Sequence, residues 1–112
     1  MKQLIAIPTF DGYLCSHFGH CEKFAIFKIE DSKITEEKYL VPPPHEPGLL
    51  PAWLSSYGVT HVIAGGMGHR AISLFNQQNI QVFTGADAKP ARVLAEDFLE
   101  DKLTTGVNTC DH

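Results

Sequence analysis

The sequence predicts a single mixed α/β domain in which helices cover the faces of a five-stranded sheet. Three observations predict this class. The first part of the chain holds short apolar or alternating segments with the period of strands. The second part alternates short apolar runs with segments of helical spacing. The chain has 112 residues, which is enough to bury one core without disulfides. The expected element order is β-β-β-α-β-α-β-α.

Three strands are expected before the first helix. Residues 4–7 are apolar, and we expect Pro8 to end this strand. Residues 23–29 are apolar at most positions, which suits a strand covered on both faces. Within residues 34–41, apolar side chains alternate with charged and other polar ones, as in a solvent-facing edge strand. A turn over residues 30–33 would join the last two strands into a hairpin.

The second half contains the helices. A proline-rich segment over residues 42–48 separates it from the hairpin. The expected elements are a helix over 49–57, a strand over 59–64, a helix beginning after Gly68, a strand over 80–84 and a helix over 88–102. Right-handed crossovers would place the first, fourth and fifth strands side by side and parallel. The loops over residues 10–21 and 65–69 would then share one end of the sheet, where ligands of such sheets usually bind.

The glycine loop between the fourth strand and the second helix is one candidate binding site. Gly65, Gly66, Met67 and Gly68 could place backbone amides at a helix start, which favours an anion. The loop lacks the full dinucleotide fingerprint and has no Gly-Lys-Ser/Thr, so a P-loop is excluded. The open alternative is a turn that serves only the fold.

A second candidate site is rich in metal donors. Cys15, His17, His20 and Cys21 place four thiol and imidazole groups within seven residues. Further candidate ligands stand elsewhere in the chain, at His45, His69, Cys110 and His112. The alternative reading makes the cysteines core residues, His45 a helix cap and the end of the chain a solvated terminus.

Composition excludes several classes of function. The net charge is −4 and no Lys/Arg cluster exists, which argues against a nucleic-acid partner. No apolar run reaches the roughly 20 residues of a membrane helix. The odd count of three cysteines indicates reduced thiols, and the N-terminus is too short before Pro8 for a signal peptide, so we expect a cytoplasmic protein. No catalytic triad or paired carboxylates stand out, so we do not expect an enzyme.

Several motifs together resemble the dinitrogenase iron–molybdenum cofactor biosynthesis family, which includes NifX-like proteins, the C-terminal domain of NifB and the orange protein of sulfate reducers. The matching stretches are residues 16–24 (SHFGHCxxF), 44–48 (PHEPG), 51–54 (PxWL), 62–71 (VIAGGMGxxA) and 81–85 (QVFTG). The resemblance implies a ribonuclease H-like three-layer fold without that enzyme's acidic metal site. We expect the cofactor-binding domain over residues 1–103 and a flexible Cys/His-containing tail over 104–112.

The resemblance implies a small carrier of an iron–sulfur or molybdenum/copper-containing cluster, without turnover. Its partner would be a protein that donates or accepts the metallocluster. The alternative is a regulatory or adaptor domain that binds a small anion or nucleotide at Gly65–Gly68. A hydrolase is a third reading, but the sequence lacks the clustered acids that two metals need.

Overall fold

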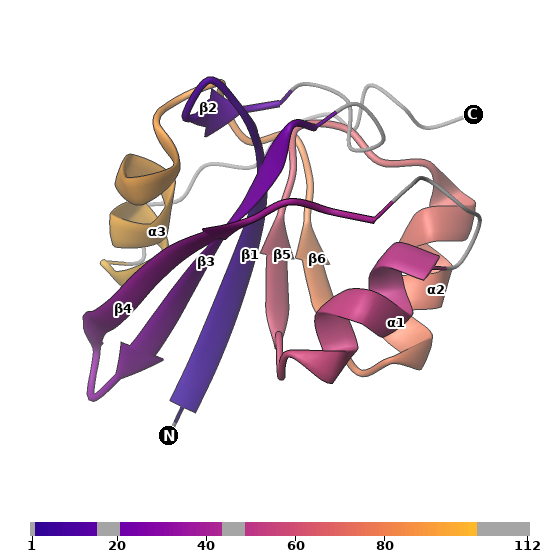
Figure 1. Ribbon diagram of the computed structural model, residues 1–112, viewed down its shortest axis with the longest axis horizontal. Coiled ribbons are helices and arrows are strands. Elements are labelled where there is room, and N and C mark those ends of the chain that lie inside the picture. The colour runs from indigo at the N-terminus through magenta and orange to yellow at the C-terminus, as the bar shows by residue number, and fades with distance from the viewer. Residues whose placement is uncertain (1, 16–20, 44–48, 101–112) are drawn as a thin grey trace.

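The computed structural model describes residues 2–15, 21–43 and 49–100, which form a mixed sheet between two layers of helices (Figure 1). Helices α1 and α2 cover one face of the sheet, and α3 covers the other. The strands are β1 (Lys2–Phe10), β2 (Tyr13–Leu14), β3 (Lys23–Glu30), β4 (Lys33–Leu40), β5 (His61–Ile63) and β6 (Gln81–Phe83), and the helices are α1 (Leu49–Ser56), α2 (His69–Gln77) and α3 (Ala91–Leu99).

The strand order confirms the predicted fold class. The main path runs β4-β3-β1-β5-β6, and the short strand β2 pairs with the end of β1. Strands β1, β5 and β6 are parallel neighbours, whereas β3 and β4 run antiparallel. The two crossovers therefore place the strands as expected. Strand β2 is an addition that the sequence did not indicate, because two residues carry no periodicity.

Pro8 does not end β1, contrary to the prediction. The strand continues to Phe10, and its carbonyl at Pro8 accepts a hydrogen bond from the Cys15 amide (2.9 Å). The nitrogen and carbonyl of one strand residue point to the same edge, so the missing N–H of Pro8 faces the β2 side. On that side β5 pairs with β1 only at Ile5 and Ala6. The full ladder with β3 lies on the other side and is unaffected.

The predicted hairpin is present between β3 and β4. Its two-residue turn has positive φ at both Asp31 (52°) and Ser32 (62°), as in the type I′ turns that match the twist of paired strands. A bulge follows, because Lys28 pairs with Glu36 whereas Ile29 pairs with Ile34. The extra residue in β4 lets Ile34 join the α3 side of the core, next to a strand that is otherwise largely exposed.

Two apolar clusters lie on the two faces of the sheet. Side chains of β1, β3 and β5 alternate between them, as a period of two requires. The cluster beneath α1 and α2 contains Ala6, Phe24, Ile26, Leu50, Leu54, Val59, Val62, Ala64, Met67, Phe75 and Ile80. The cluster beneath α3 contains Ile5, Ile7, Leu14, Ala25, Phe27, Ile29, Ile63, Ala86, Ala91, Leu94 and Ala95. Each helix is therefore held mainly by one apolar face.

Several elements are shorter than predicted. Helix α3 begins at Ala91 rather than at residue 88, because Pro90 is extended (φ −54°, ψ 141°). The chain before it bonds to β2, where the Leu14 amide donates to the Lys89 carbonyl (3.0 Å). Helix α1 ends at Ser56, and Gly58 follows with φ at 85°. None of the three described helices has both the length and the apolar character needed to cross a bilayer.

Candidate functional site

The carboxyl ends of the parallel strands meet at one end of the sheet, which is the upper end in Figure 1. The loops after β5 and β6 are joined by a hydrogen bond from the Gly85 amide to the Gly65 carbonyl (2.7 Å). The loop after β6 also contacts the β1–β2 segment through Leu14 and Lys89. The shared end that the sequence predicted is therefore present, and it is the usual ligand-binding end of such a sheet.

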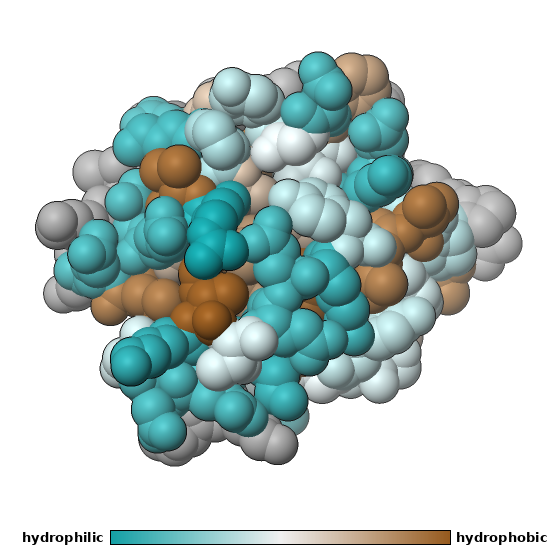
Figure 2. Space-filling view, turned by 60° about the vertical axis from the view of Figure 1, so that its left-hand side comes forward, coloured by the Kyte–Doolittle hydropathy of each residue, from teal (hydrophilic) through white to brown (hydrophobic). Residues whose placement is uncertain are grey.

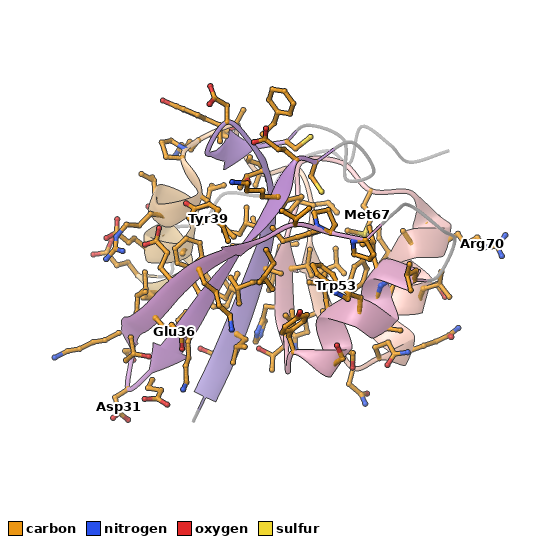
Figure 3. All side chains as sticks on the ribbon, in the orientation of Figure 1. Asp31, Glu36, Tyr39, Trp53, Met67 and Arg70 are labelled. Atoms are coloured by element: carbon orange, nitrogen blue, oxygen red, sulfur yellow. The ribbon has the colours of Figure 1, made fainter. Side chains whose placement is uncertain are left out.

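Both described cysteines lie at this end. Cys15 is buried and follows β2, with its amide bonded to Pro8. Cys21 is half-buried and packs against the core cluster that contains Met67 and Phe24. Figure 3 shows Met67 on the inner side of the fold, between the sheet and α2. Segments far apart in the sequence thus bring Cys21 and Met67 into one packed cluster.

The fold changes the acidity of the Cys21 thiol. Burial raises its pKa from the ordinary 9.0 to about 11, and the nearby Cys15 adds to the increase, while a backbone hydrogen bond lowers it. Without a metal, the Cys21 sulfur therefore keeps its proton at neutral pH. A bound cation would favour the thiolate, so metal binding at this sulfur would release the proton.

The glycine loop leads directly into α2. Gly68 is extended (φ −67°, ψ 155°) and makes no side-chain capping hydrogen bond within the described chain. Its carbonyl accepts a hydrogen bond from the Ile72 amide (3.1 Å) at the beginning of the helix. The start of α2 therefore lies at the ligand end of the sheet, where amide dipoles favour negative charge. Gly66 and Met67 are buried, whereas Gly65 and Gly68 are partly exposed. The roles of Gly65–Gly68 in cofactor binding stay predictions.

His69 is the first residue of α2 and is exposed. It lines a shallow hollow on the helix surface with Ile72, Ser73 and Asn76. The hollow is open to solvent and holds one imidazole among polar and aliphatic side chains. His69 is therefore accessible to a ligand that reaches the beginning of α2.

The predicted metal-ligand set is only partly within the described residues. Cys15, Cys21 and His69 are described, and residues 2–15, 21–43 and 49–100 contain no group of three His, Cys, Asp or Glu side chains arranged to hold a metal ion. The other candidate ligands lie outside the described residues; they are His17, His20, His45, Cys110 and His112. The metal site, like the tail over residues 104–112, stays a prediction.

Sequence reasoning did not single out Thr9. This side chain is 1% exposed and lies on the same face of β1 as the buried Ile5 and Ile7. Its hydroxyl donates to the Lys23 carbonyl (2.8 Å). The sequence did contain a signal for this role: Thr9 follows Ile5 and Ile7 at every second position of an apolar strand. This spacing predicts a buried hydroxyl, which needs a hydrogen-bond partner.

His61 and Trp53 are packing residues. The ring of His61 lies 6.1 Å from that of Phe83 and 5.3 Å from that of Phe98, and burial lowers its pKa. Its Nδ1 is 2.7 Å from the Thr60 hydroxyl. Trp53 packs against the cluster beneath α1 and α2. His61 begins β5 and so lies at the end of that strand opposite the candidate site.

Comparison with known proteins agrees with this geometry. The sequence model of the family described as "Dinitrogenase iron-molybdenum cofactor" matches residues 1–101. The chain belongs to this family. It is 34% identical over 104 residues to the uncharacterized protein MJ0580 of Methanocaldococcus jannaschii, with 88% of this chain and 87% of that protein covered. The family thus spans both cysteine positions and the glycine loop.

Solved structures share the fold. The crystal structure of PH0822 has a TM-score of 0.85 at 29% identity and covers 92% of this chain and 94% of its own. The apo form of the orange protein from Desulfovibrio gigas has a TM-score of 0.73 at 19% identity, with 95% and 94% covered. These likenesses confirm the arrangement of a mixed sheet between two layers of helices.

Proposed function

We propose that this protein binds a small iron–sulfur or molybdenum-containing cluster and passes it to another protein during cofactor biosynthesis, without catalytic turnover. The observation that carries the proposal is the pair of neighbouring thiols, Cys15 and Cys21, at the ligand end of the sheet, where Cys21 packs in the cluster that contains Met67. Membership of the dinitrogenase iron–molybdenum cofactor family supports a role in cofactor biosynthesis.

The chemistry of the site suits such a cargo. Thiolates are soft ligands that favour iron in clusters and copper(I). The positive end of α2 would stabilise the sulfide or oxo groups of an anionic cluster. Partial burial of Cys21 would shield one side of the metal from water. His69 could add an imidazole from the first turn of α2, and His17, His20, His45, Cys110 and His112 remain further proposed ligands.

A carrier also needs particular surroundings. We propose that it works in the cytoplasm, where thiols stay reduced, and that it exchanges its cargo with a donor or acceptor protein. The protein would hold and release the metallocluster, and no bond of a substrate would be made or broken.

The test is an anaerobic titration with iron and sulfide and, separately, with a copper–thiomolybdate. Wild-type protein should develop visible charge-transfer bands, and the double variant Cys21→Ser with His20→Ala should lose them. His61→Phe is the matched control, because this histidine lies at the other end of β5. Unchanged bands in the double variant would contradict the proposal. Protection of amides 65–69 by phosphate or a nucleotide, without metal bands, would favour the adaptor alternative.

A further inference from the structure

Thr9 supplies a buried hydroxyl where the strand pattern favours an apolar side chain. Ile5 and Ile7 precede it on the same face of β1, and all three residues are fully or almost fully buried. Thr9 is the one buried polar side chain among residues 3–15, 21–43 and 49–100, whose exposure the structure describes. Burying a hydroxyl costs free energy unless it is hydrogen-bonded. The hydrogen bond to the Lys23 carbonyl offsets this cost and ties Thr9 to the beginning of β3.

Two of the hydrogen bonds of Thr9 hold the chain directly after Cys21. The hydroxyl donates to the Lys23 carbonyl (2.8 Å), and the Thr9 carbonyl accepts from the Glu22 amide (2.8 Å). Thr9 and Lys23 are also the last register pair between β1 and β3. Cys21 stands two residues beyond this pair, so the ladder itself does not hold it. The bonds at Glu22 and Lys23 determine where the Cys21 backbone leaves the sheet.

Thr9 and Cys21 act on opposite faces. Thr9 belongs to the face covered by α3, where Leu14 and Ile7 lie. Cys21 packs on the other face, against the cluster with Met67. The hydroxyl can thus restrain the Cys21 backbone without occupying any space that a ligand at the sulfur would need. Valine would fill the same volume on β1, with good strand propensity, but could not make this bond.

We propose that Thr9 is a positioning residue that holds the Cys21 thiol in place for its ligand. The inference rests on the proposed function for its biological meaning, but the placement of the sulfur can be measured without any metal. Loss of the hydroxyl leaves the Lys23 carbonyl without this donor and loosens the segment that carries Cys21. The sulfur then becomes more accessible, and cluster binding weakens.

The test compares Thr9→Val with Thr9→Ser in metal-free protein. Iodoacetamide labelling at a fixed pH is followed for each cysteine by peptide mass spectrometry. Thr9→Val should label Cys21 about fivefold faster than wild type, as expected for loss of one hydrogen bond. Thr9→Ser, which keeps the hydroxyl, should label Cys21 at close to the wild-type rate. Buried Cys15 is the internal control, because global destabilisation would accelerate both cysteines.

Wild-type labelling of Cys21 in Thr9→Val would overturn the inference, and so would equal acceleration of Cys15. Failure of Thr9→Ser to restore the rate would also overturn it, because the methyl group would then be the cause. The same variants are titrated with iron and sulfide, where Thr9→Val should need about fivefold more metal for half-maximal absorbance. If wild type forms no bands while the labelling pattern holds, the proposed function fails and the positioning role of Thr9 stands.

Discussion

At the scale of single residues, Cys21 combines partial burial with a nearby second thiol. Burial is the larger cause of its raised pKa, and Cys15 is the second. Unfolding removes both effects, so the thiol ionises near 9.0 in the unfolded chain and near 11 in the folded one. Above pH 9 the unfolded chain loses this proton while the folded chain keeps it. The contribution of Cys21 to stability is therefore complete below 9.0 and is lost as the pH rises to about 11.

Cys21→Ser should remove the part of the stability loss at alkaline pH that comes from ionisation of the Cys21 thiol. Urea unfolding of wild type and variant, followed in metal-free protein across the range from 9.0 to about 11, should show a smaller decrease in unfolding free energy for the variant. The comparison cancels the ionisation of lysines and tyrosines, which both proteins share. Parallel curves throughout this range would contradict the assignment.

His61 gives the opposite dependence on the acid side. Burial lowers its pKa below the ordinary 6.5, so the folded chain favours the neutral ring. The stability from the neutral ring is present above 6.5 and is lost as the pH falls through the folded-state value. His61→Phe keeps an aromatic ring beside Phe83 and Phe98 but cannot take up a proton. Its unfolding free energy should decrease less than that of wild type on acidification, as measured by urea unfolding.

Met67 is a core residue at the edge of the candidate site, with 1% of its surface exposed. Met67→Ala should lower the unfolding free energy by about 2–5 kcal/mol, because it leaves a cavity. Met67→Leu conserves volume and should cost less than about 1.5 kcal/mol. Chemical unfolding measures both. Loss of metal bands in the stable Leu variant would identify the sulfur as a ligand, and retained bands would assign Met67 to packing.

At the scale of elements, β4 is a long edge strand that carries its own protection. Glu36 and Lys38 form an ion pair (4.0 Å) along the strand, and Glu37 bonds to Arg92 of α3 (2.6 Å). Figure 2, which brings the left-hand side of Figure 1 forward, shows mostly hydrophilic side chains with apolar side chains in several patches. Charges and a bulge are the usual means of preventing edge-to-edge pairing. The eight residues of β4 are therefore a poor template for aggregation.

The turn before β4 stores strain that a substitution can relieve. Figure 3 shows Asp31 at the tip of the hairpin, and Ser32 beside it has φ at 62°. Glycine adopts this conformation without the Cβ penalty. Ser32→Gly should therefore raise the unfolding free energy by about 1 kcal/mol. Thermal or urea unfolding tests this, and a Ser32→Ala variant serves as the control because it keeps the Cβ. Equal stability of the Gly and Ala variants would contradict the strain argument.

At the scale of the whole molecule, the sequence predicted what depends on periodicity and handedness. Apolar runs located the core strands, and the crossover rule brought the loops after β1 and β5 to one end. Contacts between distant segments decided the rest. The start of α3 at Ala91 depends on a bond from its amide to the Gly12 carbonyl, and the buried role of Thr9 depends on Lys23. Local propensity carries no information about such partners.

The ligand set was less predictable than the fold for a related reason. Donor residues are visible in a sequence, but ligand geometry depends on which side chains face one another. Cys15 and Cys21 lie close enough for one to affect the ionisation of the other, whereas Met67 is enclosed by the core. Cys15 and Met67 are buried and Cys21 is half-buried, and these exposures follow from packing between distant segments rather than from spacing along the chain.

The position of Trp53 has an optical consequence. It is the single tryptophan of the chain, its ring centroid is 5.8 Å from that of Phe24, and it packs on the same cluster as Cys21. A cluster bound at Cys21 that absorbs near the indole emission would quench that emission. Stopped-flow fluorescence of the unlabelled protein should therefore dim on uptake of a coloured cargo and brighten again on release to an acceptor. The kinetics of delivery can thus be recorded through a native residue.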